Sequence, residues 1–382
     1  MTETAITRRG FGVAAGAAAG AALLDLAVRP RPALARLAHG MPADMIQLNS
    51  NENPYGLSKA AREAMARSFD VASRYPGDVE QEVRITLAAH HGVTTEHILL
   101  ACGSGEILRL ADATFLGPGR TLVVAEPTFE AVLTYSGVTR AEAITVPLDA
   151  DFRHDLAAMA KACDSRTGLV YVCNPNNPTG TLVGGDDLAA FLAALPASAT
   201  VLVDEAYHHF VESAAYRSAV AMLASRPNLV VARTFSKIYG LAGMRLGYAI
   251  ASPENVDAMR AHAAANRANA AVLAAALASL RDAGLVPAVR TRLNETRAFL
   301  CGELARDGRR FIPSEANFVM VELGTDVEPV IAAFKEKKIL VGRKFPSMPT
   351  WLRVSIGTPA ETAAFVKALR DIVPAAPSSR GV

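Results

Sequence analysis

Between His97 and Ala251, short apolar runs alternate with longer amphipathic segments, and this alternation constrains the fold more than any other feature. The runs have the length of buried strands and the segments between them the length of helices. The predicted strands are Ile98–Ala101, Thr121–Ala125, Ala143–Val146, Leu169–Cys173, Val201–Val203, Leu229–Ala232 and Leu246–Ala251; the helices between them include Glu106–Phe115 and Asp186–Leu195. We therefore expect an α/β fold with a mainly parallel seven-stranded sheet between helices.

The chain changes character after Pro253. Long helices are predicted from Glu254 to about Asp282 and from Pro287 to about Arg306. Strand-like runs at Asn317–Glu322 and Trp351–Ile356 then flank a helix near Val327–Lys337. These elements predict a second, smaller α+β domain. The expected boundaries are 36–75 for an N-terminal arm with part of the small domain, 76–275 for the large domain and 276–375 for the small domain.

The first 35 residues read as an export signal. Arg8 and Arg9 precede an uncharged run of small residues from Gly12 to Leu24, and Ala33-Leu34-Ala35 is an A-x-A-type cleavage site. Paired arginines before a weakly hydrophobic segment resemble a twin-arginine signal. The run is too short to span a bilayer stably. We expect an exported or periplasmic protein; the alternative is an alanine-rich extension of a cytoplasmic one.

Charge and cysteine usage exclude several classes of function. The net charge is +2 without a long basic run, so a nucleic-acid partner is not expected. The four cysteines are widely spaced and form no CxxC pattern. Neither a metal site nor a disulfide framework is therefore expected.

Lys237 is the first candidate for chemistry. It follows the strand Leu229–Ala232, and open α/β sheets bind ligands at the carboxyl ends of their strands. Its neighbours Ser236 and Arg245 suit an anion. A lysine in such a place can form an imine with an aldehyde, although a lone lysine after a strand is also a common solvated surface group. The working hypothesis is an enzyme that binds pyridoxal 5'-phosphate through Lys237.

Other strand ends carry residues that suit the same cofactor. Ser104 and Gly105 open a helix whose free N–H groups could bind a phosphate. Phe129 could stack on a pyridine ring or be an ordinary core aromatic. Asn177 lies in a turn stiffened by two prolines and a glycine.

Asp204 follows the apolar strand Val201–Val203, where a carboxylate is unfavourable unless a cation pairs with it. A protonated pyridine nitrogen is such a cation, and the pairing keeps the ring an electron sink. Tyr207 could reach the phenolic oxygen of the cofactor from the same side. The alternative for Asp204 is a capping aspartate.

The order of these motifs resembles the fold-type I pyridoxal phosphate aminotransferases of class I/II, and within them the histidinol-phosphate aminotransferase branch. The resemblance covers about Gln47 to Leu369. The motifs that carry it are LNSNENPYG from Leu48, RYPG from Arg74, NPNNPTG from Asn174, DEAY from Asp204, TFSKIYGLAGMRLGY from Thr234 and WLRVSIGT from Trp351.

The resemblance implies a role for each matching position around the cofactor. Lys237 matches the Schiff-base lysine that moves the proton between substrate and cofactor, and Asp204 matches the partner of the ring nitrogen. Asn177 and Tyr207 match the groups on the phenolic oxygen. The remaining cofactor positions are Ser104, Gly105, Ser236 and Arg245 for the phosphate, and Phe129 for ring stacking.

The resemblance also implies substrate contacts and a homodimer. Arg353 matches the arginine that binds the substrate α-carboxylate, and Asn51 lies near the substrate pocket. Tyr75 matches a tyrosine that reaches the phosphate of the neighbouring subunit, which implies shared active sites. Arg343 is the candidate for the family's additional substrate-phosphate arginine, although a glycine separates it from Ile339-Leu-Val.

The expected reaction is transamination between an L-amino acid or histidinol phosphate and a 2-oxo acid, with 2-oxoglutarate favoured. Three features favour a donor other than histidinol phosphate. They are the register of Arg343, the export signal, and the glycine at position 105, where the family often carries aspartate. Decarboxylation, racemisation or oxidation of an amino acid is the alternative for the same cofactor. A non-catalytic binding protein is the more remote one.

Overall fold

We analysed a computed structural model of the chain, which describes residues 44–265 and 267–374. The predicted export signal, residues 1–35, lies outside the described residues. The chain divides between Ile46 and Gln47. Residues 44–46, which include the first residue of strand β1 (Ile46–Leu48), belong to the first part. All other described residues belong to the second part.

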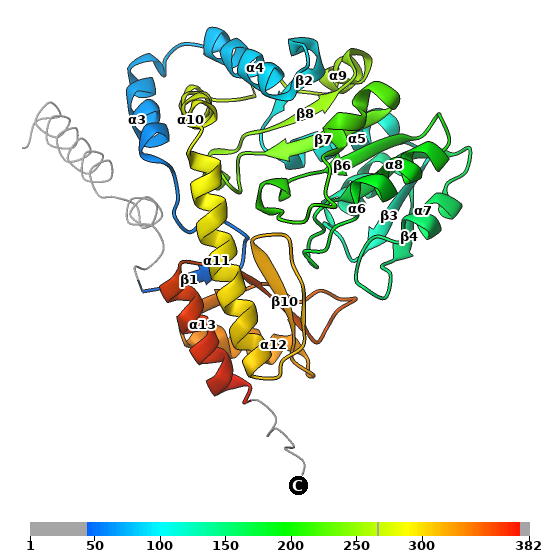
Figure 1. The fold of residues 1–382 in the computed structure, drawn as a ribbon. Coiled ribbons are helices and arrows are strands. Elements are labelled where there is room, and N and C mark those ends of the chain that lie inside the picture. Colours follow the sequence, from blue (N-terminus) through cyan, green and yellow to red (C-terminus); the bar gives the residue numbers. More distant parts are fainter. Residues whose placement is uncertain (1–43, 266, 375–382) are drawn as a thin grey trace, which may run out of the picture. The chain divides into compact units, whose positions relative to one another are not determined.

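A seven-stranded sheet forms the upper part of the molecule in Figure 1. Its spatial order is β2-β8-β7-β6-β5-β3-β4. The strands are β2 (Ile98–Ala101), β3 (Thr121–Glu126), β4 (Glu142–Pro147), β5 (Thr167–Cys173), β6 (Thr200–Asp204), β7 (Leu229–Thr234) and β8 (Gly247–Ala251). Six of the strands run in one direction and β8 runs in the other, so the predicted mainly parallel sheet is confirmed.

Helices pack against this sheet because its strands are apolar on both faces. Every residue of β5, β6 and β7 is buried. The helices are α5 (Ser104–Phe115), α6 (Ala131–Thr139), α7 (Leu156–Ala162), α8 (Gly185–Ala194) and α9 (Pro253–Arg260). On one face, Ile107 and Leu108 of α5 join Val124, Leu202 and Val230 of the strands in one continuous apolar core. Burial of apolar surface is the main force that holds these layers together.

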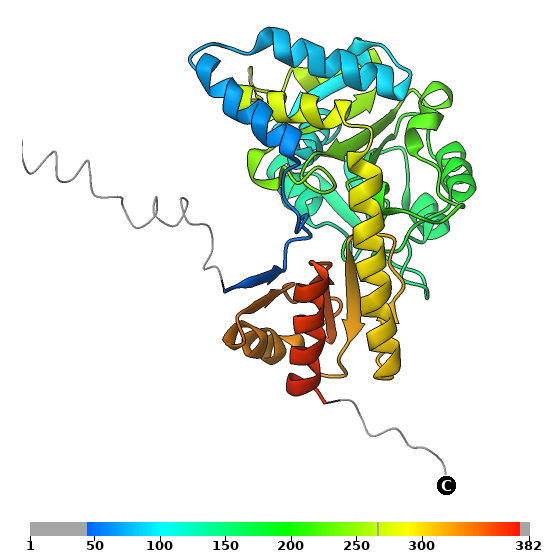
Figure 2. The same cartoon turned by 60° about the vertical axis from the view of Figure 1, so that its left-hand side comes forward.

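A second group of elements lies below the large sheet in Figures 1 and 2. Its antiparallel sheet has the order β12-β10-β9. Its strands are β9 (Phe311–Ile312), β10 (Phe318–Glu322) and β12 (Trp351–Ser355). The group also contains β11 (Ile339–Val341), which lies outside this sheet, and the helices α11 (Leu285–Arg306), α12 (Val327–Glu336) and α13 (Pro359–Ile372). Phe334 of α12 stacks on Phe365 of α13. The long helix α11 runs from the upper group to the lower group in both views.

Three helices lie side by side at the amino-terminal side of the fold. They are α3 (Lys59–Ser68), α4 (Gly77–His91) and α10 (Ala270–Arg281), and α10 packs against both of the others. Short 3-10 turns complete the chain at Phe69–Val71, Thr95–His97, His208–Phe210, Ala219–Ser225 and Ala242–Met244. The domain boundaries expected near residues 75 and 275 stay predictions.

One predicted helix is wrong in its extent. The sequence predicts continuous helix from Glu254 to about Asp282, whereas α9 ends at Arg260 and α10 begins at Ala270. Two side-chain contacts oppose a continuous helix. Arg267 Nε donates to the backbone oxygen of Leu100 on β2 at 3.0 Å, and Asn269 Oδ1 accepts from the Val272 amide at 2.8 Å as an N-cap. These tertiary and capping contacts override the helix propensity of the alanines.

None of the helices in residues 44–265 and 267–374 is by itself long and apolar enough to cross a membrane. The pair α10 and α11 passes the same test of length and composition jointly, across a bend of 84°.

Candidate active site

A pocket of about 500 Å³ lies at the carboxyl ends of the parallel strands. The chain segments that follow β2, β3, β5, β6 and β7 meet there, as expected for an open α/β sheet. The second group of elements contributes Arg343, Phe345 and Arg353. The predicted site residues that line it are Asn51, Ser104, Gly105, Phe129, Asn177, Asp204, Tyr207, Ser236, Lys237, Arg245, Arg343 and Arg353.

Asp204 is the last residue of β6, and Glu205, which follows it, has a different partner. Asp204 is buried and lines the pocket; its carboxylate accepts from the Tyr171 hydroxyl at 3.0 Å and from the Ala206 amide at 3.0 Å. Glu205 instead forms a buried ion pair with Arg233 at 2.8 Å. Burial raises the pKa of Asp204 to about 6, so the carboxylate lies in a place that favours a cationic partner.

Lys237 lies three residues beyond β7 and reaches the same space. Its Nζ donates to the backbone oxygen of Ser50 at 3.1 Å and lies 5.6 Å from the centre of the Tyr207 ring. Burial, followed by the positive charge of Arg353, lowers the pKa of Lys237 to about 8. A lysine with a lowered pKa is more readily available as the neutral amine that attacks an aldehyde or accepts a proton.

Arg245 and the start of α5 form the anion-binding end of the pocket. Arg245 donates to Ser236 Oγ at 3.3 Å and to the backbone oxygen of Ala242 at 3.0 Å. Gly103 precedes α5, and a Cβ there would lie 2.3 Å from a guanidinium nitrogen of Arg245. No side chain in the described residues caps the N-terminus of α5. The first amides of this helix, at Ser104 and Gly105, are therefore free to bind an anion beside Arg245.

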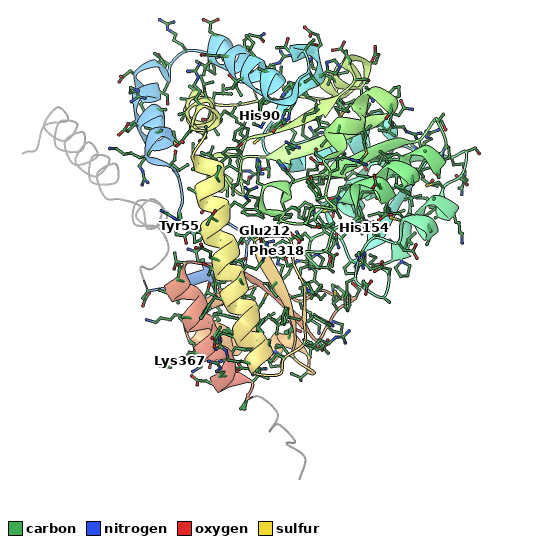
Figure 3. The ribbon with its side chains drawn as sticks, viewed as in Figure 1. Tyr55, His90, His154, Glu212, Phe318 and Lys367 are labelled. Atoms are coloured by element: carbon green, nitrogen blue, oxygen red, sulfur yellow. The ribbon has the colours of Figure 1, made fainter. Side chains whose placement is uncertain are left out.

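Arg353, contributed by β12, lines the same pocket and is held by two neighbours. It donates to Asn177 Oδ1 at 2.6 Å and to the backbone oxygen of Asn49 at 2.9 Å. Its Nε is buried and has no hydrogen-bond partner in the described part of the chain. Phe318 lies 5.7 Å from the guanidinium carbon, at the end of β10 that faces the large sheet (Figure 3). A fixed arginine with a free donor suits a carboxylate ligand.

Asn51 and Tyr207 connect the amino-terminal segment to the pocket. Asn51 Nδ2 donates to the Tyr207 hydroxyl at 3.2 Å, and Ser355 Oγ donates to Asn51 Oδ1 at 2.9 Å. The backbone of Asn51 has φ = 54°, a left-handed conformation that asparagine tolerates better than most residues. Burial raises the pKa of Tyr207, so its hydroxyl stays protonated and can donate to a ligand oxygen.

Phe129 and Arg343 occupy the more open part of the pocket. Phe129 lies in the segment after β3 and is 39% exposed, so it is not an ordinary core aromatic. Arg343 follows β11, and its guanidinium donates to Glu130 at 2.6 Å. The structure thus brings Arg343 into the pocket despite the intervening Gly342.

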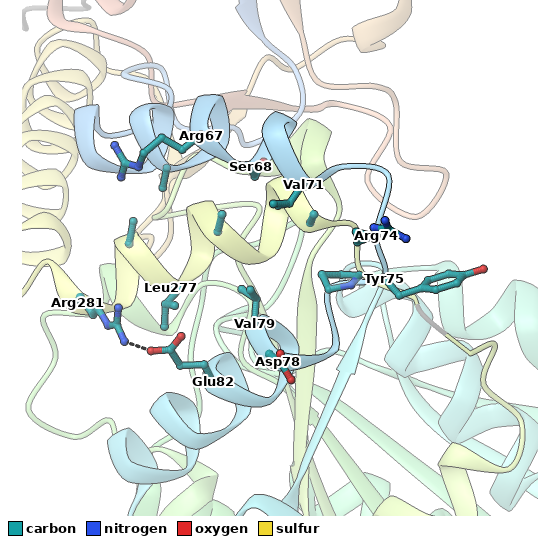
Figure 4. A pocket seen from close by; sticks show the side chains of 15 residues that line it. Arg67, Ser68, Val71, Arg74, Tyr75, Asp78, Val79, Glu82, Leu277 and Arg281 are labelled. Atoms are coloured by element: carbon teal, nitrogen blue, oxygen red, sulfur yellow. Dashed lines mark hydrogen bonds and ion pairs between the residues drawn. The ribbon is translucent and has the colours of Figure 1, made fainter.

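Tyr75 is the one predicted site residue that does not join this pocket. It is 83% exposed and lines a different pocket of about 460 Å³ between α3, α4 and α10. Its side chain points away from that pocket in Figure 4, where Val71, Val79 and Leu277 form the apolar wall. A residue expected to act in a neighbouring subunit must be exposed in its own chain, and the role of Tyr75 stays a prediction.

Comparison with known proteins decides the family. The family model described as aminotransferase class I and II matches residues 43–369. The chain belongs to this family. It is 40% identical to a histidinol-phosphate aminotransferase of Moorella thermoacetica over 333 residues, which is 86% of each protein. The fold is therefore fold-type I, and the protein is a pyridoxal-phosphate-dependent aminotransferase.

Solved structures agree with this assignment. A structure from Erwinia carotovora atroseptica has a TM-score of 0.83 and 32% identity, covering 86% of this chain and 95% of that one. The histidinol-phosphate aminotransferase of Sinorhizobium meliloti, solved in complex with pyridoxal-5'-phosphate, has a TM-score of 0.81 and 25% identity. That comparison covers 90% of this chain and 94% of the other.

The pocket of this aminotransferase fits its cofactor. A cradle bounded by Gly103, the amides of α5 and Arg245 suits a phosphate, and the missing Cβ of Gly103 leaves room for the guanidinium of Arg245 beside those amides. The buried Asp204 suits a protonated ring nitrogen. Lys237 lines the same pocket with a lowered pKa, as an aldehyde-binding lysine requires.

Sequence reasoning missed several residues of this aminotransferase pocket. Asn49, Ser50, Glu52, Thr128 and Phe345 also line it. Tyr171 does not line it but holds Asp204. A buried tyrosine usually needs a partner for its hydroxyl, so a tyrosine inside the apolar run Leu169–Cys173 was a usable signal that a partner exists, although not that the partner is Asp204.

Proposed function

We propose that this aminotransferase takes the amino group of an L-amino acid or of histidinol phosphate and transfers it to a 2-oxo acid such as 2-oxoglutarate. The observation that carries the proposal is the convergence of Lys237, Asp204 and Arg353 on one pocket. The free Nε of Arg353 supports binding of the substrate's carboxylate, or of the phosphate in histidinol phosphate.

We assign the central roles to two residues. Pyridoxal phosphate, when bound, supplies an aldehyde for the amino group and a protonated ring that withdraws electrons from the substrate Cα. Lys237 would hold the aldehyde of the bound cofactor and would move a proton between the substrate Cα and the cofactor carbon C4'. Its lowered pKa supports the role of base, because the neutral amine is present near neutral pH. Asp204 holds the proton on the ring nitrogen.

The other predicted residues position the reactants. Ser104, Gly105, Ser236 and Arg245 bind the phosphate. Asn177 and Tyr207 orient the phenolic oxygen, and Phe129 covers one face of the ring. Arg353 and Arg343 bind anionic groups of the substrate, while Asn51 keeps the hydroxyl of Tyr207 in place through a hydrogen bond of 3.2 Å.

The test is a half-reaction screen of the cofactor-loaded protein with single amino acids and with histidinol phosphate. We expect the absorbance of the bound cofactor to change with at least one donor, and a 2-oxo acid to reverse the change. Release of carbon dioxide or of the D-amino acid without an oxo acceptor would instead indicate a different reaction. No response to any donor would indicate a non-catalytic binder. The Lys237→Ala variant should lose turnover while keeping its fold.

We also propose that the protein is a homodimer with shared active sites, in which Tyr75 acts on the cofactor phosphate of the partner. The exposed Tyr75 and the apolar groove beside it support this assembly.

We further propose that the chain is exported through a twin-arginine signal. The pair Arg8 and Arg9 before an uncharged run supports the proposal. Replacing both arginines by lysine should retain the protein in the cytoplasm, measured by cell fractionation. An unchanged distribution between cytoplasm and periplasm would contradict it.

A further inference from the structure

Two arginines of the pocket share one aromatic ring. The guanidinium carbon of Arg343 lies 4.3 Å from the centre of the Phe345 ring, and that of Arg353 lies 5.3 Å from it. Both line the pocket. The positive charge of Arg343 contributes, after burial, to lowering the pKa of Arg353, so the two cations repel each other. An anion that binds between them, or a carboxylate that neutralises one of them, offsets this repulsion.

The two arginines differ in how they are held. Arg353 is buried and its neighbours in the chain are neutral acceptors. Arg343 is half exposed, and its guanidinium donates to the carboxylate of Glu130 at 2.6 Å. Glu130 directly follows Phe129 at the start of α6, so the ion pair connects the segment after β3 with the segment after β11. Glu130 thus neutralises the arginine that is more accessible to a ligand.

We propose that Glu130 is a specificity-determining residue, because its carboxylate competes with a distal anionic group of the substrate for Arg343. The inference rests on the proposed function. A substrate with a single carboxylate needs only Arg353 and leaves the Arg343–Glu130 pair intact. A dicarboxylate or a phosphate monoester must displace Glu130 to use Arg343. The pair therefore lets one pocket accept an amino donor without a distal charge and, at a reduced affinity, an acceptor that carries one.

The solvent exposure of the Arg343–Glu130 pair sets how strongly Glu130 can reduce the affinity for a distal anion. The side chains of Arg343 and Glu130 are 54% and 45% exposed, and ion pairs of this kind are weak because water competes for both partners. Displacing Glu130 should therefore change the affinity for a distal anion by only about 1.5-fold to fivefold. The effect should shrink when added salt screens the charges.

The experiment compares the cofactor-loaded protein with its Glu130→Gln variant. Binding of two unreactive ligands, glutarate and propionate, is measured by calorimetry, and KM is measured for 2-oxoglutarate against pyruvate. We expect Glu130→Gln to strengthen glutarate binding about 1.5-fold to fivefold relative to propionate and to lower the KM ratio of 2-oxoglutarate to pyruvate by a similar factor. Both changes should diminish at high salt.

Two further variants make the result specific. Glu142→Gln removes a carboxylate from another half-exposed ion pair, with Arg166 at 3.0 Å, outside the pocket, and should leave both ratios unchanged. Arg343→Gln should weaken glutarate relative to propionate, and adding Glu130→Gln to it should have no further effect.

The outcomes separate this inference from the proposed function. Unchanged ligand and KM ratios in Glu130→Gln, or an equal effect in the absence of Arg343, would overturn the role of Glu130. Loss of transamination with every donor in the native protein would overturn the proposed function, while glutarate and propionate binding would still decide the role of Glu130.

Discussion

The buried carboxylate of Asp204 suits the cofactor, but it destabilises the folded protein when the cofactor is absent. Burial raises the pKa of Asp204 from its ordinary 3.8 to about 6. Between these two values the folded state binds more protons than the unfolded state. The free energy of unfolding of the cofactor-free protein therefore falls as pH rises from about 4 to about 6, and it stays low above that window.

We predict that Asp204→Asn stabilises the cofactor-free protein at pH 8 by up to about 3 kcal/mol, since a shift of about two pKa units corresponds to that energy. The variant should have little effect near pH 4 and should lose transamination. Denaturant unfolding at both pH values measures the difference. Asp186→Asn, which changes an exposed carboxylate paired with Arg217, serves as the control and should stay within about 0.5 kcal/mol. A variant at position 204 that is less stable than the native protein at pH 8 would contradict the prediction.

At the scale of residues, the sequence predicted the site residues that follow strands, but it missed the residues that hydrogen-bond to them. Asp204 and Lys237 were identified because each follows an apolar run directly or within a few residues. Tyr171, which donates to Asp204 from the adjacent strand, depends on strand order, and strand order is not written in a local pattern. The partner of Arg343 is a similar case, because Glu130 is more than two hundred residues away.

At the scale of elements, the start of α5 shows how a turn creates an anion site. Gly103 has φ = +83°, which side chains rarely adopt, and its missing Cβ leaves room for the guanidinium of Arg245. Two residues later, a Cβ at Gly105 would meet only the Tyr135 hydroxyl, at 3.9 Å. The two glycines of one turn therefore differ in what they tolerate.

We predict that Gly103→Ala raises the Kd for pyridoxal phosphate at least about tenfold, because the added methyl group displaces Arg245 and strains the backbone by about 1–3 kcal/mol. Gly105→Ala should change the Kd by less than about threefold, since a backbone amide remains and the contact is ordinary. An absorbance titration of the cofactor-free proteins measures both values. Equal Kd values for the two variants would show that the approach of Arg245 to Gly103 does not matter for phosphate binding.

Helices and strands could be predicted where the burial of their side chains determines the pattern of apolar residues in the sequence. All seven strands of the large sheet were expected. Fully buried strands such as β5, β6 and β7 read as continuous apolar runs, whereas the edge strand β4 is mostly exposed and was expected from its short run Ala143–Val146. The break between α9 and α10 was not, because alanine is compatible with helix everywhere and the break depends on the bond from Arg267 to Leu100 on a distant strand. Local patterns thus give the type of an element more reliably than its ends.

At the scale of the whole molecule, the groove between α3, α4 and α10 carries exposed apolar side chains. Val71 and Tyr75 line it and are more than half exposed (Figure 4), and Phe69, two residues before Val71 in the chain, is exposed as well. Contiguous exposed apolar surface of this kind commonly marks a protein interface. The proposed homodimer would cover it and bring Tyr75 to the pocket of the partner.

We predict that mixing two inactive variants, Tyr75→Ala and Lys237→Ala, restores activity. If Tyr75 acts in the partner's site, a mixed dimer contains one site that lacks both residues and one site in which both are native. If Tyr75 acts in its own chain, every site of the mixed dimer lacks one of the two. Transamination is assayed after subunit exchange, with native mass spectrometry to confirm that mixed dimers have formed. Activity should approach one native site per mixed dimer, whereas mixed dimers without activity, or a chain that stays monomeric, would refute the shared site. The Val71→Ala variant, present in both chains, serves as a control. It keeps the active-site residues, so its dimer dissociation constant reports whether loss of apolar contact alone weakens the assembly.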